Sequence, residues 1–123
     1  MIIPEVLIDT NILIAHVMGH ERLIFEPKQI GISTITMFEM LSLAGLSQDE
    51  ERKIRELLTL TGIFSVTPPI AEKASNLART RKKKHVLDLL IAATALELGI
   101  PLMTKNIKDF KNLSDLQVVT RLP

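Results

Sequence analysis

Short apolar segments alternate along this chain with longer amphipathic ones, and this alternation constrains the fold more than any other feature. Each short segment is rich in β-prone residues and is bounded by polar or turn residues, which is typical of strands. The expected strands are 5–8, 30–35, 63–67, 101–104 and 116–120. Apolar residues at helical spacing predict helices over 36–44, 48–61, 69–81 and 86–98. This order predicts an α/β fold on a mostly parallel sheet of four to five strands, with the ligand site at the carboxyl ends of the strands.

Length and composition exclude several other classes of protein. The chain has 123 residues, the length of one domain, which we take as 1–123, and 46% of them are hydrophobic. It has no Cys, which excludes a disulfide framework, a thiolate metal site and a Cys nucleophile. The N-terminus lacks the basic region of a signal peptide, and the most apolar run, 89–96, is far shorter than the ~20 residues of a membrane span. We therefore expect a soluble, cytoplasmic domain.

Four acidic residues occupy positions where a charge is costly. Asp9 ends the first expected strand, and Asp109 comes just beyond the fourth. Glu39 and Asp88 lie inside apolar stretches of two expected helices. Because the burial of a lone charge is expensive, such carboxylates must be partnered or bind a cation.

Each of the four acids also has an ordinary structural explanation. Asp9 fits an Asx turn at a strand end, and Glu39 follows Thr36 at the spacing of a helix capping box. Asp88 and Asp109 fit first-turn acids, which the helix dipole favours. These explanations do not account for the coincidence that two acids follow strands at one edge of the sheet, while two are expected in first turns of helices that start near it. Converging carboxylates without Cys suit Mg²⁺ or Mn²⁺, so the pattern favours a metal-dependent nuclease.

Four segments of the chain match the motifs of a known family, and together they span nearly the whole sequence. The third and fourth, joined in this order, are the most specific. The segments are V-L-I-D-T-N-I-L-I (6–14), I-S-T-I-T-M-F-E-M (32–40), D-L-L-I-A-A-T-A (88–95) with L-G-I-P-L-M-T (98–104), and T-K-N-I-K-D-F (104–110). On these segments the chain resembles PIN-domain ribonucleases, most closely the VapC-type toxins of toxin–antitoxin pairs.

The resemblance implies a three-layer α/β/α sandwich whose acidic pocket binds Mg²⁺ or Mn²⁺ and cleaves single-stranded RNA. Asp9, Asp88 and Asp109 correspond to metal ligands, and Glu39 to a ligand or to the base that orients the attacking water. The corresponding supporting polar positions are Asn11, Thr104 and Asn106. The resemblance also implies an antitoxin partner and a homodimer. The chain departs from the family in two ways: Leu87 stands where the family often has Pro, and the segment between the first two motifs is short.

A basic run precedes Asp88, and the charge balance of the chain makes it informative. The chain has 15 basic and 14 acidic residues, so setting the four clustered acids aside leaves 10 acids against 15 bases. Such a run is ordinarily a solvated helix end, but beside a phosphodiesterase pocket it equally fits contacts to RNA phosphates. The run consists of Arg79, Arg81, Lys82, Lys83 and Lys84.

Two further features have both a structural and a functional interpretation. His16 and His20 would share one face of a helix and could begin a zinc site, but no third ligand is evident. The apolar stretches 12–14 and 23–25 are ordinary core by default, and a homodimer or antitoxin surface is the functional alternative.

Other functions remain to be weighed against a nuclease. A haloacid-dehalogenase-like phosphatase needs a second acid where the chain has Asn11, and a receiver domain needs acids at strand ends rather than in helices. A catalytically silent PIN domain that acts as an RNA-binding or assembly module is the main alternative from another class. A housekeeping RNA-processing nuclease without an antitoxin is the other.

Overall fold

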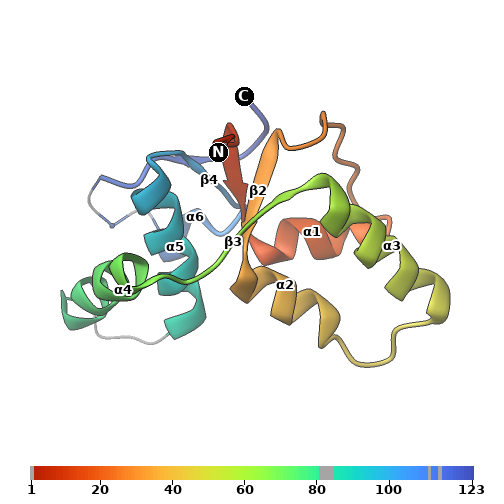
Figure 1. Ribbon diagram of the computed structural model, residues 1–123, viewed down its shortest axis with the longest axis horizontal. Coiled ribbons are helices and arrows are strands. Elements are labelled where there is room, and N and C mark those ends of the chain that lie inside the picture. Colours follow the sequence, from red (N-terminus) through yellow and green to blue (C-terminus); the bar gives the residue numbers. More distant parts are fainter. Residues whose placement is uncertain (1, 81–84, 111, 114) are drawn as a thin grey trace.

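A computed structural model describes residues 2–80, 85–110, 112–113 and 115–123 of the chain (Figure 1). Strands and helices alternate through most of it, as the sequence predicts. Within these residues the elements are β1 (Val6–Ile8), α1 (Thr10–Val17), β2 (Ile30–Ser33), α2 (Thr34–Leu41), α3 (Gln48–Leu60), β3 (Gly62–Phe64), α4 (Pro68–Thr80), α5 (Val86–Leu98), β4 (Leu102–Met103), α6 (Ile107–Phe110) and β5 (Val118–Val119).

The five described strands form one sheet in the order β3-β2-β1-β4-β5, and every neighbouring pair is parallel. The central strand β1 pairs with β2 through Val6 and Ile30, and with β4 through Ile8 and Met103. The chain leaves β1 towards β2 on one side and returns to β4 on the other. The carboxyl ends of β1 and β4 therefore lie at the point where the strand order switches direction, where open α/β sheets bind their ligands.

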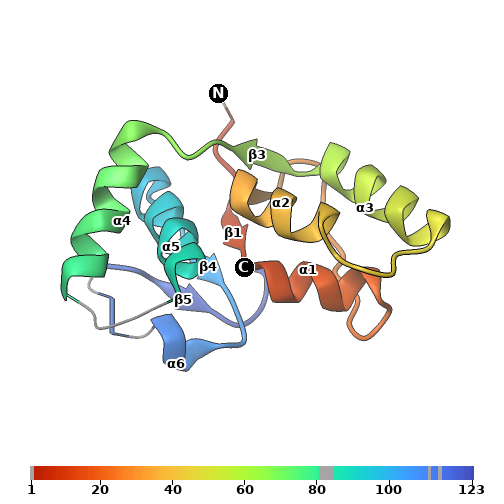
Figure 2. The same cartoon turned by 90° about the horizontal axis from the view of Figure 1, so that it is seen from below.

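Helices cover both faces of the sheet, which confirms the predicted three-layer α/β/α sandwich. Figure 2 shows α1, α2 and α3 on one side, and α4, α5 and α6 on the other. The alternation of side chains along β1 explains the layers: Val6 and Ile8 pack in a core with residues of α1 and α3, whereas Leu7 packs in a second core with residues of α5 and α6. All three side chains are fully buried.

The helix boundaries follow from local capping chemistry. The Ser47 hydroxyl caps α3, and Glu50 returns a bond to the Ser47 N–H to complete a capping box. The predicted helix 86–98 is confirmed as α5, and Gly99 ends it in the left-handed conformation at φ 69°. The predicted start of α2 is wrong by two residues. Ser33 ends β2 and also caps α2 by accepting from the Ile35 N–H, so the helix begins at Thr34.

The apolar stretches 12–14 and 23–25 prove to be mainly core. Ile12 and Leu13 are buried in the core shared by α1 and α3, and the remaining residues pack partly against it, apart from Ile24, which is 78% exposed. Among the described residues, no helix is both long and apolar enough to cross a membrane.

Candidate active site

Asp9 lies directly after the central strand, between β1 and α1, with only 3% of its surface exposed. Its backbone N–H donates to the Met103 carbonyl over 3.0 Å, which aligns it with the end of β4. The Thr104 hydroxyl then donates to Asp9 Oδ2 over 2.7 Å, and the Asn106 backbone N–H donates to Thr104 Oγ1 over 3.0 Å. The Asp9 carboxylate is thus held across the sheet by the neighbouring strand end.

The environment of Asp9 disfavours a negative charge. Burial raises the pKa of its carboxyl group above 3.8, and the charges of Glu39 and Asp109 raise it further. The bonds from Thr104 and from the Thr10 backbone oppose this effect. The structure therefore keeps a carboxylate at a place where hydroxyl and amide donors only partly compensate for its loss of water.

Glu39 reaches the site from an unexpected part of its helix. The prediction of a first-turn position and a capping box with Thr36 is wrong, because α2 begins at Thr34 and Glu39 lies in its last turn. Its Oε1 accepts a 2.6 Å hydrogen bond from the Thr10 hydroxyl. The same hydroxyl lies 2.9 Å from that of Thr36. Glu39 is thereby tied to the residue that follows Asp9.

Asp88 lies in the first turn of α5, as predicted, and its side chain is 33% exposed. Its Oδ2 is 4.0 Å from Nδ1 of His85. Burial and the charge of Asp9 raise the pKa of Asp88 to about 6, with smaller contributions from Asp109 and Glu39 and an opposing one from His85. All three other acids thus contribute to the raised pKa of Asp88.

Asp109 lies in the first turn of the short helix α6, beyond β4, and is exposed. Its charge raises the pKa of both Asp9 and Asp88. The four acids come from the end of β1 and from α2, α5 and α6, and they share one electrostatic environment. Nothing in the spacing of a single element produces this arrangement, which depends on the parallel sheet.

Comparison with known proteins matches residues 6–116 to the PIN domain. The chain belongs to the PIN-domain family. It is 32% identical to Ribonuclease VapC19 of Mycobacterium tuberculosis, over 90% of this chain and 96% of that protein. It is 33% identical to Ribonuclease VapC1 of Haemophilus influenzae, over 90% and 93% of the two chains. A toxin–antitoxin complex from Klebsiella pneumoniae contains a chain of the same fold, with a TM-score of 0.75, 34% identity, and coverage of 94% of this chain and 96% of that one.

The chemistry of the donor set in this PIN domain fits a hard divalent cation. All four acids offer carboxylate oxygens, and their mutual repulsion would be relieved by a cation placed among them. In the part of the chain that the structure describes, no three acidic or histidine side chains are close enough to form a ready-made metal-binding group. The fit therefore rests on residue chemistry and shared charge.

The supporting polar residues divide into those that contact the acids and those that do not. Thr104 is fully buried and holds Asp9, whereas Asn106 contributes its backbone N–H and is exposed, as is Asn11. Sequence analysis missed Thr10 as a site residue and saw Thr36 only as a helix cap. The available signals were that Thr10 follows Asp9 directly and that Thr36 and Glu39 are one helical turn apart.

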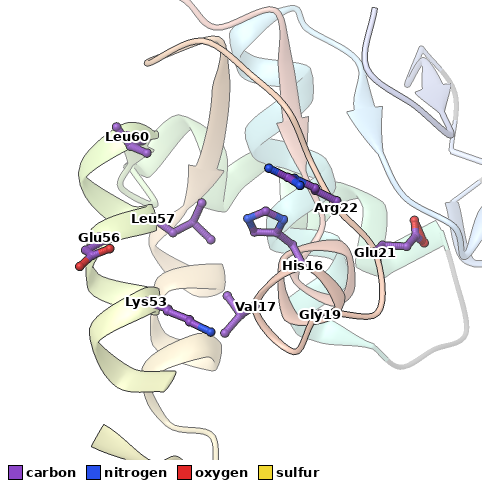
Figure 3. A pocket seen from close by; sticks show the side chains of 9 residues that line it. All are labelled: His16, Val17, Gly19, Glu21, Arg22, Lys53, Glu56, Leu57 and Leu60. Carbon is purple, nitrogen blue, oxygen red and sulfur yellow. The ribbon is translucent and has the colours of Figure 1, made fainter. Parts of the chain in front are cut away.

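A separate cavity of about 580 Å³ lies between the end of α1 and α3 (Figure 3). Figure 3 shows Leu57 and Lys53 projecting from α3 towards His16 and Val17. The His16 Nδ1 accepts from the Leu23 N–H over 3.0 Å, and burial and Arg22 lower its pKa. Because α1 ends at Val17, His20 is not on a shared helical face with His16, which removes the basis for a zinc site. The four acids of the candidate active site do not line this cavity. Its lining residues are His16, Val17, Gly19, Glu21, Arg22, Lys53, Glu56, Leu57 and Leu60.

The predicted RNA-binding run begins in the last turn of α4. Arg79 is exposed, and its guanidinium donates to the Asn76 side chain. Arg81, Lys82, Lys83 and Lys84 lie outside the described residues. Their contact with RNA stays a prediction.

Proposed function

We propose that this PIN domain is a metal-dependent endoribonuclease that cleaves single-stranded RNA by attack of water on the phosphodiester. The observation that carries the proposal is the Asp9 carboxylate, which is only 3% exposed at the carboxyl end of the central strand and is held there by the Thr104 hydroxyl. Burial and the charges of Glu39 and Asp109 raise its pKa, and the pKa of Asp88 is raised in the same way. Carboxylates gathered at a cost to one another are typical of a site that binds a cation. The ribonucleases VapC19 and VapC1 support this choice of chemistry, since each matches the chain over most of its length.

Asp9, Asp88 and Asp109 are the residues that would hold Mg²⁺ or Mn²⁺, directly or through water. A bound ion of this kind activates water and stabilises the charge that develops on the phosphodiester. Thr104 keeps Asp9 in place through its 2.7 Å bond, and the Asn106 backbone keeps Thr104 in place. Glu39 would serve as a further ligand or as the base that orients the attacking water. Asn11 and the Asn106 side chain are exposed polar groups that would assist at the rim.

The deciding experiment incubates the purified protein with a panel of defined single-stranded RNAs, with Mg²⁺, with Mn²⁺ and with a chelator. We expect metal-dependent cleavage by the wild type and none by Asp88→Asn. Asp49→Asn is the matched control, because it makes the same chemical change on an exposed face of α3. If the wild type cleaves no RNA of a broad panel in either metal, the protein is better described as an RNA-binding or assembly module.

We further propose that the protein is the toxin of a toxin–antitoxin pair and forms a homodimer. The support is the toxin–antitoxin complex from Klebsiella pneumoniae, whose matching chain is covered over 96% of its length. The product of a small neighbouring gene, co-expressed with this chain, should co-purify with it and inhibit cleavage. If no such gene product binds, a housekeeping RNA-processing nuclease becomes the better assignment. Light scattering of the isolated chain tests the homodimer.

For the RNA partner, we propose that the basic run from Arg79 to Lys84 binds phosphates. Each phosphate contact to a single strand contributes a slope of about −0.7 to the dependence of log affinity on log salt. Replacing Lys82, Lys83 and Lys84 by Gln should therefore weaken RNA binding and reduce the salt slope by about 2. Binding measured in Asp88→Asn, which should not cleave, keeps the RNA intact. An unchanged slope would assign the run to solvation.

A further inference from the structure

Two buried threonines, one at the start of α1 and one within α2, form a line of hydrogen bonds that ends at Glu39 in the last turn of α2. Thr10 is 6% exposed and Thr36 is fully buried. The Thr10 hydroxyl lies 2.6 Å from Glu39 Oε1 and 2.9 Å from the Thr36 hydroxyl. We call Thr36, Thr10 and Glu39 the hydroxyl chain.

The number of hydroxyl protons fixes which residue donates each hydrogen bond in the hydroxyl chain. An ionised carboxylate only accepts hydrogen bonds, so Thr10 must use its one hydroxyl proton on Glu39. The oxygen of Thr10 can then only accept from its neighbour, and Thr36 therefore donates to Thr10. Each bond polarises the next, which strengthens the charge-assisted bond to Glu39.

The bond of Thr36 to another helix contrasts with that of a helical threonine elsewhere in the molecule. Thr94, also fully buried, donates its hydroxyl to the Leu90 carbonyl one turn back in its own helix, over 2.8 Å. This local bond is a common way for a helical threonine to satisfy its hydroxyl. Thr36 bonds instead to the hydroxyl of another helix, 26 positions away in the sequence. The hydroxyl chain therefore links α1 to α2, whereas the Thr94 bond stays within one helix.

The place of Thr10 links the hydroxyl chain to the candidate metal ligands. Thr10 follows Asp9 directly in the chain, and its side-chain hydroxyl donates to Glu39. The residue next to one acid thus holds a second acid that comes from a different element. We infer that Thr10 and Thr36 are positioning residues, which hold the Glu39 carboxylate in register with Asp9 for the reaction. This inference rests on the proposed nuclease function.

The test compares Thr10→Val and Thr36→Val with Thr10→Ser and Thr36→Ser. Valine keeps the shape of threonine and removes the hydroxyl, whereas serine keeps the hydroxyl. We expect Thr10→Val to lower kcat by about 10- to 100-fold with little change in KM, because a small displacement of a catalytic group has effects of this size. Thr36→Val should show a smaller drop, and each serine variant should recover most of the activity. Thr94→Val is the matched control and should keep the wild-type rate.

Two further measurements distinguish positioning from stability. In a Glu39→Ala background, Thr10→Val should cause no further loss, because the group that it positions is already gone. Wild-type kcat in Thr10→Val, or equal losses in Thr10→Val and Thr10→Ser, would overturn the inference. A crystal structure of Thr10→Val tests it independently of activity: the Glu39 carboxylate should move, and an unmoved carboxylate would refute the inference even if the wild type cleaves RNA. Failure of the wild type to cleave RNA would refute the nuclease proposal alone.

Discussion

The outer face of α3 and the carboxyl edge of the sheet both contain several acidic residues. The acids of α3 are exposed and form ion pairs, whereas Asp9 at the sheet edge is buried and has a raised pKa. On α3, Asp49 pairs with Arg52 and Lys53, and Glu51 pairs with Arg55, all one turn away and more than half exposed. At the sheet edge, Asp9 is 3% exposed, and the hydroxyl of Thr104 donates to its carboxylate.

The two groups of acids differ in what their charges contribute to the stability of the fold. Pairs on α3 are formed within one helix and stabilise it by a few tenths of a kcal/mol each. The carboxylates of Asp9 and Asp88 are instead destabilised, since burial and neighbouring acids raise their pKa values. Raised pKa values of this kind are typical of functional sites, which is the role proposed for these acids.

Asp9→Asn should show the difference between the two regions most strongly. The change keeps the size of the side chain and removes the charge, so the protein should fold while cleavage falls by about 1,000-fold or more, as expected for loss of a transition-state electrostatic contact. The rate of RNA cleavage measures the loss of activity, and the thermal unfolding temperature shows whether the variant still folds. Asp49→Asn on α3 should leave both nearly unchanged, and comparable activity in the two variants would remove the distinction between the regions.

Thr104→Val tests the hydroxyl that holds Asp9. The variant keeps the shape of a fully buried side chain but leaves Asp9 Oδ2 without its donor, and the pKa of Asp9 should rise further. We expect activity to fall by about 10- to 100-fold, the usual cost of losing a partner that orients a metal ligand. Thr104→Ser retains the hydroxyl and should recover activity. A serine variant as weak as the valine variant would show that packing of the methyl group, rather than the hydrogen bond, matters here.

Part of this site was predictable from the sequence because it depends on strand ends. Asp9 ends an apolar strand, and Asp109 follows another, so a parallel sheet alone places them at one edge. The position of Glu39 was not predictable, because the start of α2 depends on Ser33 serving both as a strand end and as a helix cap. The bond from Thr10 to Glu39 spans 29 positions, and it depends on how α1 packs beside α2, which periodicity within either helix does not reveal.

The contrast between local signals and contacts between elements also explains which element boundaries were predicted correctly. The bounds of α5 were predicted correctly because Gly99 ends the helix through its own backbone preference. The strand 63–67 was predicted too long at its carboxyl end, since β3 ends at Phe64, where its pairing with Ser33 of β2 ends. Local chemistry marks helix ends well, whereas the length of a short strand depends on its neighbour.

Asp88→Asn tests the stability cost of the sheet edge through its pH dependence. The folded protein raises the pKa of Asp88 from 3.8 to about 6, so the folded state binds a proton more tightly than the unfolded state. The resulting penalty is absent below pH 3.8, grows between pH 3.8 and about 6, and is complete above that range. Removing the charge should therefore raise the Tm of the metal-free protein by a few degrees at pH 7.5, about 1 kcal/mol after allowing for partial exposure. The gain should disappear near pH 3.5.

Two comparisons make the Asp88→Asn experiment specific. Asp49→Asn should not raise the Tm at any pH, since Asp49 gains from its neighbours rather than losing. Mn²⁺ should raise the Tm of the wild type more than that of Asp88→Asn, because binding to the folded state alone stabilises it. A lower Tm for Asp88→Asn at pH 7.5 would mean that the Asp88 charge supports the fold, which would place it with the acids of α3.

The smallest expected effect belongs to Glu51→Gln, which removes an ion pair of 3.1 Å between Glu51 and Arg55. Both side chains are more than half exposed, so water and salt screen the pair, and the loss should be a few tenths of a kcal/mol. Chemical denaturation in urea at low and high salt measures it, and the difference from wild type should shrink as salt is added. A loss above about 1 kcal/mol would show that α3 depends on its charges more than surface pairs normally allow. The two regions would then differ in the sign of their electrostatic contribution to stability, but no longer in its size.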